Sequence, residues 1–144
     1  MNELCSFLQK NNLKIFKTNG DGNCLFSSLS LYIKKKAKDI REDVVNYIRN
    51  DEELYKHVEK TLVNQKMSDY LDNMQKDGTW GGEPEIIAAS RMYNKKIIII
   101  TPKNIFIYSG YGLICVFSIQ FEEKDENIYL FYNGLNHYDS IIKE

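Results

Sequence analysis

The chain has 144 residues, of which 43% are hydrophobic and 27% are charged, and its formal net charge is −1. A chain of this length is typical of one domain and can bury a core without disulfides. The near-zero net charge gives no electrostatic reason to expect a nucleic acid or an anionic membrane as partner. The apolar run from Ile97 to Ile100 is too short to span a bilayer. We therefore expect a single domain over residues 1–144 that binds neither nucleic acid nor membrane.

The first half of the chain has a helical pattern. A short amphipathic helix at the N-terminus and a brief extended segment at 13–16 lead into a polar, glycine-rich loop at 18–23. Apolar residues recur at helical spacing directly after this loop, so a buried helix is expected to begin near Cys24. Asp39, with Glu42 three residues later, predicts the N-cap of the next helix. Further helices are expected at about 52–64, 67–76 and 84–93, the last with Pro84 in its first turn.

The second half has the pattern of strands. Two β-branched segments flank the turn Pro102-Lys103-Asn104, which predicts a hairpin. Strands are expected at 96–101, 105–108, 113–119, 127–132 and 137–142. Helices first and strands later indicate an α+β domain.

The three cysteines are odd in number and include no Cys-x-x-Cys pair. This pattern argues against a disulfide scaffold and against a zinc site, and it fits a reducing compartment. The N-terminal sequence lacks the apolar run of a secretory signal. We expect a cytoplasmic protein, and a monomer, because no exposed heptad pattern indicates a coiled coil.

Cys24 stands where the glycine-rich loop meets the predicted helix. The N–H groups and partial positive charge of a helix start favour a thiolate and can hold an oxyanion. Gly22 lets the backbone turn and approach a substrate. The alternative is a buried, inert cysteine that serves packing alone.

A cysteine nucleophile needs a base, and the chain has two histidines. His57 lies in a charged helical segment and is expected to be exposed. His137 opens the last predicted strand, so Asp139 points to the same side and can fix the tautomer of the imidazole. The alternative is a surface histidine beside a surface aspartate. Together with Cys24, the pattern predicts a cysteine hydrolase acting on an amide or an ester.

Three segments resemble the motifs of the ovarian tumour (OTU) family of cysteine peptidases, whose members mostly cleave ubiquitin. The nucleophile motif is matched by Gly20–Phe26, the middle motif by Trp80–Glu83 with Lys95–Ile100, and the histidine motif by Asn136–Ile141. Their order and spacing agree with the family, and the resemblance extends from about residue 13 to 142.

The resemblance implies an OTU-like cysteine proteinase fold, in which a small, mostly antiparallel sheet is packed between helices. It implies that Cys24 is the nucleophile and His137 the general base, with Asp139 as the third residue and Asp21 as the runner-up. The backbone amides of Asp21, Gly22, Asn23 and Cys24 would form the oxyanion hole. No metal or organic cofactor is expected.

By the same resemblance, the partners are conjugates of ubiquitin or of a ubiquitin-like modifier. A competing hypothesis is a catalytically silent ubiquitin-binding module, although the intact Cys24, His137 and Asp139 argue against it. Trp80 is expected to be a packing anchor rather than a substrate contact.

Overall fold

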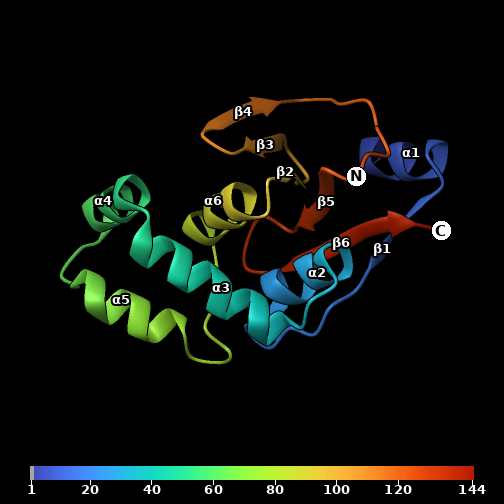
Figure 1. Cartoon of the computed structure of the whole chain (residues 1–144). Helices are drawn as coiled ribbons and strands as arrows, with labels where there is room; N and C mark the ends of the chain where they lie inside the picture. Colours follow the sequence, from blue (N-terminus) through green and yellow to red (C-terminus); the bar gives the residue numbers. More distant parts are fainter. Residues whose placement is uncertain (1) are drawn as a thin grey trace.

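The computed structural model describes residues 2–144 as one six-stranded sheet with helices on both faces (Figure 1). The helices are α1 (Asn2–Lys10), α2 (Cys24–Ile33), α3 (Ala37–Asn50), α4 (Glu52–Thr61), α5 (Met67–Met74) and α6 (Glu83–Met92). The strands are β1 (Leu13–Phe16), β2 (Lys96–Ile100), β3 (Ile105–Ser109), β4 (Gly112–Val116), β5 (Asn127–Tyr132) and β6 (Tyr138–Lys143).

The strand order in the sheet is β1-β6-β5-β2-β3-β4. β2 and β5 pair in parallel, and the other neighbours are antiparallel. β6 therefore lies between β1 and β5, and the helix α2 packs against it. This topology brings the beginning of α2 and the beginning of β6 together, although they are far apart in the sequence.

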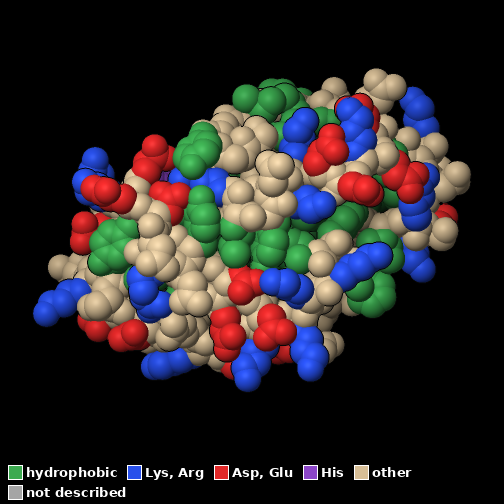
Figure 2. Space-filling model, in the orientation of Figure 1, with side chains coloured by type: hydrophobic (Ala, Val, Ile, Leu, Met, Phe, Trp, Pro, Cys, Tyr) green, Lys and Arg blue, Asp and Glu red, His purple; other side chains and the backbone are tan. Residues whose placement is uncertain are grey.

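Two apolar layers hold the helices to the sheet, because successive residues of a strand face opposite sides. Ile97 and Ile99 of β2 pack in the larger layer, beneath α2, α3 and α6. Ile98 and Ile100 pack in the smaller layer, beneath α1. On the outer surface seen in Figure 2, basic and acidic side chains are interspersed.

The α+β class and the mostly antiparallel sheet are confirmed, as are the β2–β3 hairpin and the start of α2 at Cys24. Pro84 lies in the first turn of α6, as predicted. None of the helices in the described part of the chain has the length and apolar character that crossing a bilayer demands.

Several predicted boundaries were wrong. Helix α3 begins at Ala37 with Lys36 as its N-cap, so Asp39 lies inside the first turn, where its charge suits the helix dipole. The strand predicted at 113–119 ends at Val116, because its partner β3 begins at Ile105, the residue that pairs with Val116. The helices predicted to end at 64 and 76 end at Thr61 and Met74.

Candidate active site

Cys24 is the first residue of α2 and is 1% exposed. The preceding Asn23 is the N-cap, but its side chain does not cap the helix. Instead, its Oδ1 accepts hydrogen bonds from Arg41 Nη2 at 2.6 Å and from the backbone N–H of Gly78 at 2.9 Å. Asn23 thus ties the loop before the nucleophile to the loop before α6.

Gly22 is required by this arrangement. Its φ is +85°, and a Cβ atom at this position would lie 1.9 Å from the carbonyl oxygen of Gly78. A side chain would therefore strain the backbone and push the two loops apart. The conformation of the nucleophile loop depends on glycine here.

Arg41 is a buried residue of α3 that the sequence reasoning missed. Its guanidinium donates to the Met74 carbonyl at 2.8 Å and stacks on the Phe26 ring at 4.4 Å from the centroid. Burial lowers the pKa of Arg41, while the charges of Asp77 and Glu85 act in the opposite direction. Arg41 belongs to the apolar stripe of its helix, because Val44, Val45 and Ile48 follow it at i+3, i+4 and i+7. This spacing is the signal that would have identified it.

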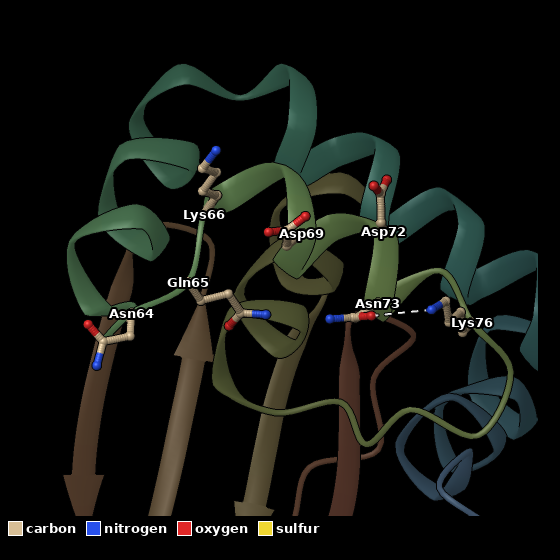
Figure 3. Close-up of a pocket in the computed structure, with 7 residues that line it drawn as sticks. All are labelled: Asn64, Gln65, Lys66, Asp69, Asp72, Asn73 and Lys76. Atoms are coloured by element: carbon tan, nitrogen blue, oxygen red, sulfur yellow. Dashed lines mark hydrogen bonds between the residues drawn. The ribbon is translucent and has the colours of Figure 1, made fainter.

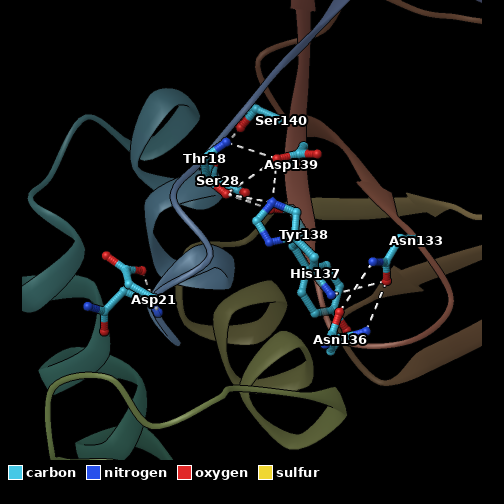
Figure 4. A network of polar contacts seen from close by, with 10 residues as sticks. Thr18, Asp21, Ser28, Asn133, Asn136, His137, Tyr138, Asp139 and Ser140 are labelled. Atoms are coloured by element: carbon cyan, nitrogen blue, oxygen red, sulfur yellow. Dashed lines mark hydrogen bonds and ion pairs between the residues drawn. The ribbon is translucent and has the colours of Figure 1, made fainter.

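His137 and Asp139 form a close pair at the start of β6. His137 Nε2 lies 2.8 Å from Asp139 Oδ1, and the side chains are 22% and 4% exposed. The same carboxylate oxygen accepts the backbone N–H of Thr18 at 2.9 Å (Figure 4). Because Nε2 faces a carboxylate, it carries the proton, and Nδ1 is the ring nitrogen left to act as a base.

The turn before β6 is held by one side chain. Asn133 Oδ1 accepts the backbone N–H groups of Leu135, Asn136 and His137 at 2.8, 2.9 and 3.1 Å. This loop conformation sets the direction in which the His137 side chain leaves the backbone.

Helix α2, which begins at Cys24, packs against β6, and the backbone amide of Tyr138 in this strand acts to lower the pKa of the Cys24 thiol. Burial raises the pKa of Cys24, and the negative charge of Asp139 adds to this effect. The amides of Tyr138, Leu25 and Cys24 lower that pKa, as a helix start should, but burial has the larger effect. The sulfur is therefore protonated at rest, and a base must remove its proton before attack.

The charge of Asp139 acts on the Cys24 thiol, and Asp139 is paired with His137. Asp21 lies apart from the His137–Asp139 pair (Figure 4). Asp21 is exposed, and its Oδ1 accepts the backbone N–H of Asn23 at 3.1 Å. Of the four amides expected to form the oxyanion hole, that of Asn23 is thus engaged within its own turn. The amides of Cys24 and Leu25 lie beside the sulfur.

The prediction that Trp80 is a packing anchor was wrong, because its side chain is 48% exposed. The neighbouring Gly81 makes the close contact instead: a Cβ atom there would lie 2.9 Å from Leu25 and 3.1 Å from Phe26. The backbone packs on α2 at Gly81 and leaves the indole outside. His57 is exposed, as predicted.

A separate hollow lies along α5 and is lined by polar and charged side chains (Figure 3). It contains neither Cys24 nor His137. Among the described side chains, those of residues 4–144, no group of three His, Cys, Asp or Glu residues is arranged to hold a metal ion.

Residues 19–140 match the family model of the OTU-like cysteine proteases. The chain belongs to this family. Deubiquitinating enzyme 9 of Arabidopsis thaliana, which is named for its ovarian tumour domain, is 30% identical over 133 residues, covering 89% of this chain and 35% of the relative. OTU domain-containing protein 2 of Saccharomyces cerevisiae is 30% identical over 127 residues, covering 78% and 40%. The chain thus spans about a third of the length of the Arabidopsis relative.

Solved structures have the same fold. The OTU domain of OTUD1 superposes with a TM-score of 0.72 at 21% identity, covering 99% of this chain and 93% of that one. An OTU deubiquitinase of Wolbachia pipientis, solved bound to ubiquitin, gives a TM-score of 0.74 at 14% identity and covers 92% and 96%. These matches establish the OTU-like fold.

Proposed function

We propose that this protein is a cysteine isopeptidase that removes ubiquitin from conjugates. The proposal is supported by the His137–Asp139 pair on β6 and by the packing against this strand of the helix that begins at Cys24, within a chain of the OTU-like cysteine protease family. The substrate class is supported by the Arabidopsis relative, which is named a deubiquitinating enzyme, and by the Wolbachia protein, which was solved with ubiquitin.

In the first half of the reaction, His137 Nδ1 takes the proton of the Cys24 thiol as the sulfur attacks the carbonyl carbon of the isopeptide bond. Asp139 stabilises the imidazolium that forms, because its carboxylate accepts from Nε2 at 2.8 Å. The oxyanion is held by backbone N–H groups at the start of α2. His137 then donates its proton to the leaving lysine amine, and a thioester to Cys24 remains.

In the second half, His137 takes a proton from water as the water oxygen attacks the thioester carbonyl. The C–S bond breaks, His137 returns its proton to the sulfur, and the C-terminus of the modifier leaves as a carboxylic acid that loses its remaining proton to solvent. Because the pKa of Cys24 is raised, the resting sulfur carries its proton, and His137 must remove that proton in each catalytic cycle.

The test is hydrolysis of ubiquitin chains by the wild type, by Cys24→Ala and by Cys115→Ala. Cys115 is exposed on β4 and serves as the matched control. We expect Cys24→Ala to abolish cleavage while its thermal unfolding stays cooperative, and Cys115→Ala to remain active. Undiminished cleavage by Cys24→Ala would refute the proposal.

An alternative substrate for the same reaction is a conjugate of a ubiquitin-like modifier. A panel of modifiers carrying an electrophilic C-terminus distinguishes the two, because the thiol becomes labelled only by a modifier that the site accepts. We expect the ubiquitin probe to react fastest. A folded protein that binds ubiquitin but reacts with none of the probes would be the silent binding module instead.

A further inference from the structure

Thr18 contacts both members of the His137–Asp139 pair. It follows β1, the strand that pairs with β6. Its hydroxyl oxygen lies 2.7 Å from the carbonyl oxygen of Tyr138, 3.3 Å from His137 Nε2 and 3.3 Å from Asp139 Oδ1. Its backbone N–H donates to the same Asp139 oxygen at 2.9 Å. Figure 4 shows Thr18 joined to this cluster from the side of β1.

The distances assign the hydroxyl hydrogen. A threonine hydroxyl has one hydrogen to donate, and its shortest acceptor is the Tyr138 carbonyl. The lone pairs of the oxygen are then left to face His137 Nε2. Since Asp139 Oδ1 lies 2.8 Å from the same nitrogen, the Nε2–H group points at two oxygen acceptors. A neutral imidazole with its proton on Nδ1 would instead place a lone pair against both oxygens.

We propose that Thr18 is a positioning residue that acts with Asp139 to keep the proton of His137 on Nε2 and the basic lone pair on Nδ1. The backbone N–H of Thr18 holds the carboxylate, and the hydroxyl holds the imidazole. The expected effect of Thr18 on turnover rests on the proposed isopeptidase function. Its effect on the tautomer of His137 does not, because the tautomer is measured in the protein without substrate.

Two substitutions separate the hydroxyl from the rest of the residue. Thr18→Val replaces the hydroxyl by a methyl of similar shape and keeps the backbone N–H bond to Asp139. Thr18→Ser keeps the hydroxyl and removes only the methyl. A residue that merely supports the packing of β1 against β6 would tolerate valine, which is a good strand former, at least as well as serine.

The decisive readout is the ¹⁵N NMR spectrum of the histidine side chains above their titration range, in the full chain without substrate. The chain has two histidines, and the exposed His57 is an internal reference. We expect the wild type and Thr18→Ser to hold His137 in the Nε2–H form, and Thr18→Val to populate the Nδ1–H form. In parallel, we expect Thr18→Val to lower kcat on a ubiquitin substrate about 2- to 10-fold, the range of one neutral hydrogen bond, with KM unchanged.

The proposal is overturned if Thr18→Val leaves the His137 tautomer as in the wild type, or if Thr18→Ser shifts it as much as valine does. If the wild type cleaves no ubiquitin substrate, the proposed function fails. The NMR comparison still decides the role of Thr18 in that case, because it needs no substrate.

Discussion

Replacing Asp139 should impair turnover far more than replacing Asp21. Asp139 Oδ1 lies 2.8 Å from His137 Nε2, and the carboxylate is 4% exposed, so solvent screens the contact poorly. Asp21 is exposed and accepts one backbone N–H from Asn23 within its own turn. Replacing Asp139 therefore removes a shielded hydrogen bond to the imidazole of His137, whereas replacing Asp21 removes an exposed hydrogen bond to a backbone amide.

The magnitude follows from the kind of bond that is lost. A hydrogen bond to a charged group contributes about 1.5–3 kcal/mol net, and each 1.36 kcal/mol of barrier is about tenfold in rate. Asp139→Ala should thus lower kcat by roughly 10- to 150-fold. Asp139→Asn should lose less, since its amide oxygen still accepts from His137 Nε2. Asp21→Ala removes only a turn contact and should cost less than about fivefold.

The assay is steady-state cleavage of ubiquitin carrying a fluorogenic C-terminal amide, with kcat and KM determined for each variant. Thermal unfolding of each variant checks the fold, because Asp139→Ala also leaves the backbone N–H of Thr18 without its acceptor. A larger loss of kcat in Asp21→Ala than in Asp139→Ala would mean that Asp21, and not Asp139, orients His137.

Two further predictions concern the nucleophile and its loop. Gly22→Ala should lower the free energy of unfolding by at least about 2 kcal/mol, because the new methyl group would meet the backbone carbonyl of Gly78. Gly20→Ala is the control and should change the stability little, because nothing lies near the added methyl group. Equal melting temperatures for the two variants would contradict this prediction. In the free protein at neutral pH, iodoacetamide should label Cys24 more slowly than the exposed Cys5 and Cys115, because burial raises the pKa of the Cys24 thiol and its thiolate forms only as the pH rises. Peptide mapping by mass spectrometry over a pH series measures the rates, and fastest labelling of Cys24 near pH 7 would be inconsistent with the buried, protonated thiol.

Local sequence pattern was enough for the features that depend on neighbouring residues. The start of α2 at Cys24 followed from a glycine-rich loop before an apolar helical repeat. The contact between His137 and Asp139 followed from strand alternation, even though β6 itself begins one residue later, at Tyr138.

Features that depend on distant parts of the chain were not predictable in this way. Thr18 reaches His137 and Asp139 only because β1 pairs with β6, and Arg41 reaches the nucleophile loop only because α3 packs beside α2. The direction of the pKa shift of Cys24 could not be predicted from the sequence either. The sequence indicates the helix start that favours a thiolate, but not the burial that outweighs it.

The role of Cys24 as the nucleophile is tested most directly by the reaction of the full chain with ubiquitin carrying an electrophilic C-terminus, followed by peptide mapping of the adduct. We predict one ubiquitin per chain, attached to Cys24, and loss of the adduct in Cys24→Ala and in His137→Ala. An adduct on Cys5 or Cys115, or equal labelling of Cys24→Ala, would show that Cys24 is not the nucleophile.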